Sequence, residues 1–567
     1  MHQPLVVAVT GHRDLVAAET DGIRKRVQEL FEFLAREYPD SPLQLITPLA
    51  EGADQLAAEV ARDMKIPFVV ALPMAAANYV EDFDTSGGVE RFYSLCESAE
   101  DLIVLDANLG DPDSSQLYAH LGIFLASHCH VLLAIWDGKD SDKLGGTSQV
   151  VRFHHDDIMP GYVAKSSISQ QMLIDDESDL VYHIVCSRDC PRGEPAEGLE
   201  PLDWFWFTKD RDAPRSKTLP PSHDRVLNRA AEFSRDAGRF HSRSQGWTAP
   251  LVTKSIAALG IVGLERIDDA FQGADNLAIV YQQKGLRTLR ATHILAFGMG
   301  ALFILYSDLA NVQALLYLFL GCFAAAAFLQ RLAIRRGWFR KHLDYRALAE
   351  GLRVQFYWAL AGVTQAELKY DPQDSFLRMQ DPEVGWIRNS MRVAGTLIDA
   401  KPVTGSDGLR LAIDEWVGDS ETGQLGYYAR KALERIRRRR FTEMLGKASL
   451  IASAGVVIIL LIAGADMPEQ FFEPLMTLMG ITLLSFAVRH AYAHAIGESE
   501  LIKQYEFMLR IFANARDRLD LAQDDHERRQ VLAALGKSAL DEHAQWVLMH
   551  RERSLDQTEI WRIGSGS

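Results

Sequence analysis

Two long regions of this sequence are almost free of charge, and they limit the possible folds more than any other feature. From Ala291 to Gln330 the only acidic or basic residues are His293 and Asp308, and from Ala448 to Val488 there is no Lys or Arg. Each region holds two apolar runs around a short polar centre. A helix needs about 20 apolar residues to cross a bilayer, with about 17 as the minimum. We therefore predict four transmembrane helices, and the alternative is a pair of buried hairpins in a soluble domain. The predicted spans are 291–306, 312–330, 448–465 and 471–488.

The charge around these regions predicts the side of the membrane on which each segment lies. Five of the eleven residues in 331–341 are basic, as are seven of the eleven in 430–440, whereas the two hairpin loops contain no Lys or Arg. Basic flanks stay on the cytoplasmic side. We expect a multi-pass protein of the inner membrane with both termini and the 331–447 insertion in the cytoplasm. The arginine run at 435–440 is expected to contact anionic lipid, and nucleic-acid binding is its alternative.

The overall composition excludes some classes of protein. The chain has 567 residues, too many for one compact core, and a formal net charge of −16, which argues against a general nucleic-acid binder. Its five cysteines are scattered, and Cys186 and Cys190 have no second pair at zinc spacing. We therefore expect reduced thiols, no metal site and no covalently bound cofactor. His12 and Arg13 interrupt the N-terminal apolar run, which we interpret as a strand and not as a signal peptide.

The N-terminal third alternates between short apolar runs and helical patterns. The apolar runs are nearly continuous, as in strands that are covered on both faces. In 18–38 the apolar residues Ile23, Val27, Leu30 and Leu34 recur at helical spacing. Strands that alternate with helices predict a parallel sheet with right-handed crossovers, and therefore an α/β domain. The six predicted strands are 4–10, 43–47, 66–73, 101–106, 130–137 and 180–186.

Glycine-bearing turns follow the first, second and fifth of these strands. Ligands of parallel sheets bind at the carboxyl ends of the strands, near the point where the strand order reverses. Glycine allows backbone N–H groups to approach an anion, and a helix N-terminus adds partial positive charge. Arg13 could donate a fork of hydrogen bonds to a phosphate or carboxylate, and Glu51 and Asp54 could meet ribose hydroxyls or cap a helix. The predicted ligand site consists of Thr10, Gly11, His12, Arg13, Glu51, Gly52, Ala53, Asp54, Trp136, Asp137, Gly145, Gly146, Thr147 and Ser148.

The sequences of these turns carry a family resemblance. "TGHRD" at 10–14, "PLAEGADQLAAEVA" at 48–61, and "WDG" followed by "GGTSQVV" make residues 1–190 similar to the SLOG superfamily. That resemblance implies a Rossmann-like domain that binds a nucleotide or a nucleotide-derived ligand. The hydrolase branch of the superfamily carries a longer Gly-Gly-x-Gly-Thr motif followed by a glutamate. Here "GGTSQVVRFHH" lacks the third glycine and that glutamate, so the resemblance implies binding and leaves hydrolysis open.

The second half of the chain resembles the SLATT class of membrane modules, in which hydrophobic helices are joined to sensor domains. The most specific pieces are "YRALAEGLR" at 345–353, "WVLMHRER" at 546–553, and the helix that carries Tyr505, Met508 and Phe512. The resemblance implies a membrane-acting effector of bacterial conflict or antiphage defence, which forms a pore or disturbs the bilayer when its sensor binds a nucleotide signal. The predicted organisation is a SLOG domain at 1–190, a connector at 191–265, and a membrane module at 266–555 with cytosolic helices at 490–555.

One polar pattern in the membrane module has two interpretations. Arg346, Glu350 and Arg353 share one helical face because they lie at i, i+4 and i+7. They form either an exposed, salt-linked face or a buried polar seam between subunits.

Three functions stay open at this point. The favoured one is a ligand-gated membrane effector that works as a homo-oligomer, in which a nucleotide-like ligand favours one state of the assembly. A membrane-tethered nucleotide hydrolase would use the same pocket, with Glu51, Asp54, Asp137, His154 or His155 as its base. A non-catalytic membrane scaffold is the third. The incomplete hydrolase motif favours a protein that is not an enzyme.

Overall fold

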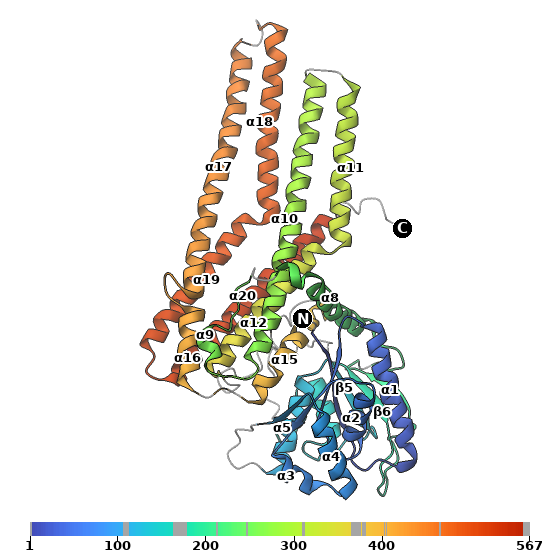
Figure 1. Cartoon of the computed structure of the whole chain (residues 1–567). Coiled ribbons are helices and arrows are strands. Elements are labelled where there is room, and N and C mark those ends of the chain that lie inside the picture. The colour runs from blue at the N-terminus through green and yellow to red at the C-terminus, as the bar shows by residue number, and fades with distance from the viewer. Residues whose placement is uncertain are drawn as a thin grey trace. The chain divides into compact units, whose positions relative to one another are not determined.

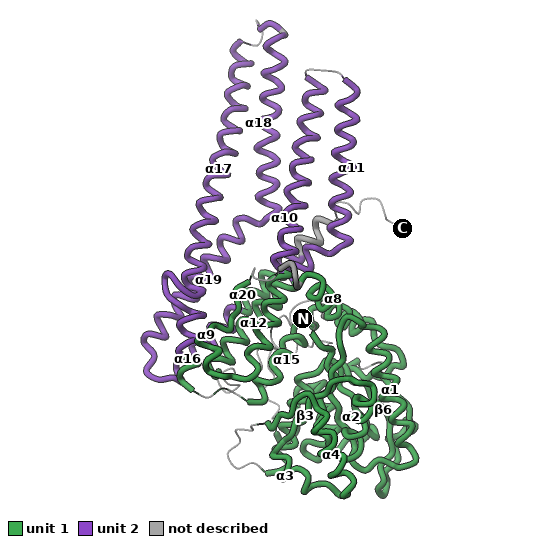
Figure 2. Tube along the Cα trace, in the orientation of Figure 1, with its two compact units in different colours: residues 1–277, 344–409, 540–548 green, residues 278–343, 410–539, 549–567 purple. Residues whose placement is uncertain are grey.

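The computed structural model divides the chain into two compact units, each built from separate stretches of sequence (Figure 2). The sheet unit consists of residues 1–277, 344–409 and 540–548, and the membrane unit of residues 278–343, 410–539 and 549–567. The structure describes residues 3–105, 113–162, 179–210, 212, 214–244, 248–308, 312–363, 376, 382–401, 403, 405–463 and 467–559.

An eight-stranded sheet lies at the centre of the sheet unit (Figure 1). Its strand order is β4-β3-β2-β1-β5-β6-β7-β8; β1 to β6 pair in parallel, and β7 and β8 are antiparallel additions at one edge. All six predicted strands are confirmed, although Asp106 at the end of the fourth lies outside the described residues. The strands are β1 (Leu5–Gly11), β2 (Leu43–Thr47), β3 (Phe68–Leu72), β4 (Asp101–Val104), β5 (Val131–Trp136), β6 (Val181–Val185), β7 (Trp204–Phe207) and β8 (Arg215–Ser216).

Helices cover both faces of this sheet, which explains why its strands are apolar throughout. Leu5, Val7 and Val9 of β1 face one core, while Val6 and Ala8 face the other. The first core is covered by α1 (Thr20–Glu37), α2 (Ala53–Asp63), α4 (Ser86–Ser98) and α8 (Pro221–Ser244). The second is covered by α5 (Ser114–Ser127), α6 (Thr147–Asp156) and α15 (Gly385–Ala400). The structure also contains η1 (Ala17–Glu19), α3 (Ala76–Tyr79), η2 (Val80–Asp82), α9 (Lys254–Ala257), α12 (Trp338–Ala361), η3 (Pro382–Val384) and α16 (Ser406–Ala412).

The segment that we interpreted as a connector, 191–265, contributes to the sheet unit. It supplies β7, β8 and α8, and Trp206 of β7 is buried in the first core. The Trp206 ring lies 5.8 Å from the ring of Phe33 on α1. The aromatic run "DWFWF" therefore supplies a strand of the sheet, between β6 and β8.

The stretch between the second and third apolar helices also folds against the sheet. A buried carboxylate at the start of β6, Asp179, lies 3.2 Å from Arg392, 3.8 Å from Arg388 and 3.8 Å from Lys209. Burial alone raises the pKa of Asp179, but these cations outweigh it and hold the pKa well below its ordinary value. The two arginines belong to α15, so residues 344–409 are part of the sheet unit and not of a separate membrane module.

The polar pattern on α12 forms a buried seam inside one chain. Arg353 donates two hydrogen bonds to Glu350, at 2.7 and 2.8 Å, and Arg346 pairs with both Glu350 and Asp275. Burial raises the pKa of Glu350, but the charges of Arg346, Arg353 and His543 outweigh it and lower the pKa to about 2. The seam therefore joins α10, α12 and α20 within the sheet unit. The sequence had suggested either an exposed, salt-linked face or a seam between subunits, and neither describes a seam inside one chain.

We predict that Glu350→Gln strongly destabilises the sheet unit, because it removes the largely buried carboxylate that Arg346 and Arg353 share; breaking such a pair costs about 3–5 kcal/mol. The carboxylate's contribution should be complete above about pH 4.5 and fade as the pH falls towards 2, since the folded pKa lies below the unfolded one. Unfolding of the full-length chain in neutral detergent measures both effects. The matched control is Glu434→Gln, which removes an exposed carboxylate paired with Lys431 and should leave the melting temperature unchanged. Equal shifts for the two variants would contradict the prediction.

Four long apolar helices make up most of the membrane unit (Figure 1). Their most apolar 18-residue windows have mean hydropathies of 1.5 to 2.3, and at most 17% of each window is buried within the chain. These helices are long and apolar enough to cross a membrane, and their exposure favours the transmembrane prediction over buried hairpins of a soluble domain. They are α10 (Leu264–Asp308), α11 (Gln313–Arg335), α17 (Gly423–Ala463) and α18 (Glu469–Ile496), accompanied by η4 (Ile413–Val417), α19 (Glu498–Leu521) and α20 (Asp525–Glu559).

Two glycines allow α10 and α18 to pack closely. A Cβ atom on Gly300 would lie 2.6 Å from the Leu484 side chain, and one on Gly480 would lie 3.1 Å from Ile304. Nearer the start of the span, Arg290 donates a hydrogen bond of 3.2 Å to the hydroxyl of Tyr492. The hydrophobic effect does not drive helices together in a bilayer, because lipid tails are as apolar as the helix surfaces. Small residues allow the helix backbones to approach closely, and the resulting van der Waals contacts stabilise the association. The two apolar hairpins are thus joined by α10 and α18.

We predict that Gly300→Leu weakens this contact, because the added side chain would overlap Leu484; overpacking of this kind costs about 1–3 kcal/mol. Gly298→Leu is the matched control, since a Cβ atom at Gly298 meets nothing within 4 Å. Unfolding in detergent should separate the two variants. A loss of stability in Gly298→Leu as large as in Gly300→Leu would show that the effect comes from the leucine and not from the contact.

Candidate functional site

The three predicted turns lie together at one edge of the sheet. They follow β1, β2 and β5, which are neighbours and run in parallel. The strand order also reverses here, because β2 to β4 continue on one side of β1 while β5 and β6 continue on the other. This is the position at which open parallel sheets bind ligands.

Glycines bring the first turn and the second into direct contact. The N–H of Ala53 at the start of α2 donates to the carbonyl of His12 at 3.1 Å. Gly52 has a φ of +81°, and a Cβ atom there would lie 2.6 Å from the same carbonyl and overlap that of Arg13. A Cβ atom on Gly11 would overlap the side chain of Ala53. Only glycine fits at these positions, so the close packing of β1 against α2 explains both residues.

Glu51 is engaged within the protein. Its carboxylate accepts hydrogen bonds from the N–H of Asp84 at 2.5 Å and from the N–H and hydroxyl of Thr85 at 3.2 and 2.6 Å. Thr85 in turn caps α4 by accepting from Gly88. The contacts of Glu51 therefore position the start of α4, and its acceptor capacity is used there.

Arg13 is the cation of this edge, and its charge is uncompensated. Its guanidinium donates to the backbone carbonyl of Asp82 at 3.1 Å and lies over the ring of Tyr118, 5.3 Å from the ring centre. Among the described residues no carboxylate oxygen comes within 4.0 Å of it. The hydroxyl of Tyr118 donates to the Asp82 carboxylate at 2.6 Å, which fixes the ring under the guanidinium. A partly buried cation without an ion-pair partner attracts an anionic ligand.

Two buried polar groups beside Arg13 have unmade hydrogen bonds. Asp54 Oδ1 and the hydroxyl of Tyr79 contact no partner, and the two side chains are 4% and 0% exposed. Burial raises the pKa of Asp54 well above its ordinary value, against the opposing charge of Arg13. Burial therefore disfavours the ionised form of Asp54, while the charge of Arg13 favours it.

His12 points to the third turn. Its Nε2 lies 3.2 Å from Oδ1 of the buried Asp137, which also accepts the N–H of Lys139 at 3.0 Å. Burial raises the pKa of Asp137, but the neighbouring His12 and the N–H of Lys139 lower it below its ordinary value. The carboxylate therefore lies beside the imidazole without a hydrogen bond between Nε2 and Oδ1.

The loop after β5 reaches the same edge through Tyr118. A Cβ atom on Gly145 would lie 2.8 Å from Cβ of Tyr118, and Gly146 forms the N-cap of α6. Ser148 bonds to Ser141 within the loop, and Thr147 is buried beside it. Tyr118 therefore connects Arg13 to the Gly145 turn. It belongs to no motif in the sequence, and only the packing of α5 reveals it.

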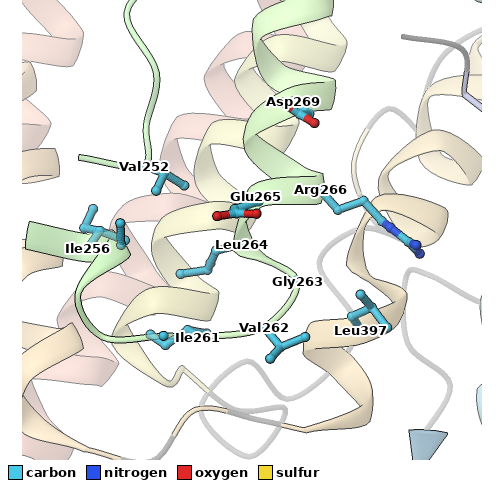
Figure 3. Close-up of a pocket in the computed structure, with 12 residues that line it drawn as sticks. Val252, Ile256, Ile261, Val262, Gly263, Leu264, Glu265, Arg266, Asp269 and Leu397 are labelled. Atoms are coloured by element: carbon cyan, nitrogen blue, oxygen red, sulfur yellow. The ribbon is translucent and has the colours of Figure 1, made fainter. Parts of the chain in front are cut away.

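Other features of the sheet unit are separate from this edge. His154 bonds to the carbonyl of Ala126 and His155 packs on Phe207, so neither faces the three turns. Among the described residues no group of His, Cys, Asp and Glu could hold a metal ion. A surface hollow of about 490 Å³, shown in Figure 3, includes none of the predicted ligand residues. Val252, Ile256, Ile261, Val262, Leu264 and Leu397 make it mainly apolar.

Comparison with known proteins adds no relative to this picture. No protein-family model matches the chain, and a search of curated proteins finds no match. The SLOG and SLATT resemblances therefore stay predictions from sequence.

We predict that Gly52→Ala unfolds the β1–α2 contact, because the methyl group would meet the carbonyls of His12 and Arg13 and the φ of +81° adds strain. The two effects together should exceed about 3 kcal/mol. Gly198→Ala is the matched control, since Gly198 has a φ of +83° but nothing within 4 Å; it should lose about 1–2 kcal/mol. Denaturant unfolding of the full-length chain gives both values, and similar losses would mean that strain alone matters at Gly52.

Proposed function

We propose that this chain is a nucleotide-sensing membrane effector, with a Rossmann-like SLOG domain as sensor and a SLATT-like helical domain in the membrane. The observation that carries the proposal is the uncompensated Arg13 at the point where the strand order reverses. A phosphate accepts paired hydrogen bonds from a guanidinium and supplies the charge that this edge lacks.

The surroundings of Arg13 support a ligand larger than phosphate. The half-buried ring of Tyr118 lies beside it, and an aromatic face can stack on a base. The unpaired Asp54 Oδ1 and Tyr79 hydroxyl offer further polar contacts. A nucleotide or nucleotide-derived molecule has all three features: phosphate, ring and hydroxyl groups.

Chain connectivity supports a role for this ligand in the membrane. α10 supplies residues 264–277 to the sheet unit and residues 278–308 to the membrane unit. Its first part is held by Asp268, which accepts from the N–H groups of Leu251 and Val252, and by Asp275, which pairs with Arg346. A ligand that favours one packing of the sheet unit therefore acts on the segment that leads into the first span. We propose that such binding gates a pore or disrupts the bilayer in a homo-oligomer that serves antiphage defence.

The distribution of charge supports an inner-membrane location with both termini in the cytoplasm. Exposed arginines gather at one end of the apolar helices, at Arg331, Arg335 and Arg336 on one hairpin and at Arg437 and Arg440 on the other. Basic ends stay on the cytoplasmic side.

A nucleotide hydrolase is the second candidate, and one pair of residues favours it. Of the possible bases, Glu51, His154 and His155 are engaged elsewhere and Asp54 is disposed to be neutral. His12 is the remaining candidate, because its Nε2 lies 3.2 Å from the Asp137 carboxylate. Release of phosphate or base from a bound nucleotide, lost in His12→Gln with binding retained, would favour the hydrolase.

We predict that Arg13→Gln weakens binding of the cognate nucleotide by about 10–150-fold, the loss expected for one hydrogen bond to a charged group. The test screens the melting temperature of the full-length chain in neutral detergent against mononucleotides, cyclic dinucleotides and ADP-ribose derivatives, because a ligand of the native state raises it. Arg188→Gln is the matched control, since Arg188 at the same edge is already paired with Asp14 at 3.0 Å. A ligand that binds wild type and Arg13→Gln equally would refute the site.

A further inference from the structure

We propose that one face of α17 binds an anionic phospholipid, with the phosphate held by Arg437 and Arg440, Phe441 at the level of the headgroup, and an acyl chain that begins at Met444. These four residues lie at i, i+3, i+4 and i+7, and therefore on one face of the helix. All four are exposed, Phe441 and Met444 to 59% and 65%. Two cations followed by two large apolar side chains match the order of a lipid headgroup and its tail.

The two arginines have no acidic partner. Among the described residues no carboxylate oxygen lies within 4.0 Å of either guanidinium. Their neighbour Arg439 differs, because its Nε lies 2.7 Å from the carboxylate of Glu443. An unpaired guanidinium presents its full fork of donors to a phosphate, whereas a paired one has already used part of it.

The position of this face along α17 matches the depth of lipid headgroups. Arg440 lies four residues before Met444, which is about 6 Å along a helix. The headgroup layer on each side of a bilayer is about 5–7 Å thick. With Met444 at the edge of the hydrocarbon, Arg440 therefore lies at the level of the phosphates.

The apolar part of the same helix continues this face into the bilayer. Beyond Met444, the exposed residues include Ile451, Ile458 and Ile462, at 71%, 55% and 81%. Lys447 interrupts them one turn after Met444, and its flexible stem allows the amine to extend back to the headgroups. It adds a third cation to the phosphate level.

This inference is independent of the nucleotide site and goes beyond the orientation rule. Orientation requires only that basic residues stay on one side of the membrane. A binding face also requires that unpaired arginines discriminate between headgroups, because an anionic lipid brings a net charge that a zwitterionic lipid lacks.

The test titrates phosphatidylglycerol, and phosphatidylcholine with the same acyl chains, into the full-length chain in neutral detergent. The apparent Kd is taken from the rise of the melting temperature with lipid concentration. We expect phosphatidylglycerol to stabilise the wild type more than phosphatidylcholine does. In Arg437→Gln/Arg440→Gln its apparent Kd should rise about thirtyfold, since each basic residue near an anionic surface accounts for about a fivefold change.

Arg439→Gln is the matched control, because it removes the same charge from the same helix at a residue that is already paired. It should keep most of the preference for phosphatidylglycerol. Equal stabilisation of the wild type by both lipids would overturn the proposal, and so would a loss in Arg439→Gln that equals half or more of the loss in the double variant. The same stabilisation by inorganic phosphate alone would show a simple anion effect and would also overturn it. Melting temperatures without lipid check that each variant is folded.

Discussion

The charge network around Asp179 determines how the whole chain is divided. This buried carboxylate at the start of β6 requires cations, and α15, which follows the second apolar helix in sequence, supplies Arg388 and Arg392. Because a buried charge left without its partner is strongly destabilising, residues 344–409 are bound to return to the sheet unit. The two apolar hairpins consequently interrupt the sequence of the sheet unit.

The candidate site depends on a contrast between two neighbouring groups. Asp54 and Arg13 would neutralise each other if both were charged, but burial disfavours the carboxylate and leaves the guanidinium unmatched. Tyr118 and the Asp82 carbonyl hold Arg13 in place without supplying a full negative charge at its nitrogens. For the anionic ligand that we propose, this edge would therefore be organised in advance, which would reduce the ordering that binding requires.

Much of this arrangement could be predicted from local patterns. Continuous apolar runs identify β1 to β6, and the parallel topology then brings the turns at Arg13, Gly52 and Asp137 to one edge. The roles of Glu51 and Tyr118 could not be predicted, because their partners Thr85 and Arg13 come from distant parts of the chain. The return of α15 was missed for the same reason. In the sequence, Arg388 and Arg392 look like arginines of an ordinary exposed helical face. Only the structure places Asp179 opposite them.

The free energy that the proposed ligand could supply and the free energy of packing between α10 and α18 are of similar size. A ligand with a tenfold preference for one state supplies about 1.4 kcal/mol per subunit. The contact between α10 and α18 depends on the reciprocal fit of Gly300 and Gly480, where a misfit costs about 1–3 kcal/mol. In the effector that we propose, one bound ligand would therefore supply enough free energy to shift the packing of one subunit's spans without unfolding them. Several coupled subunits would make that shift steep, because their preferences add before the assembly changes state.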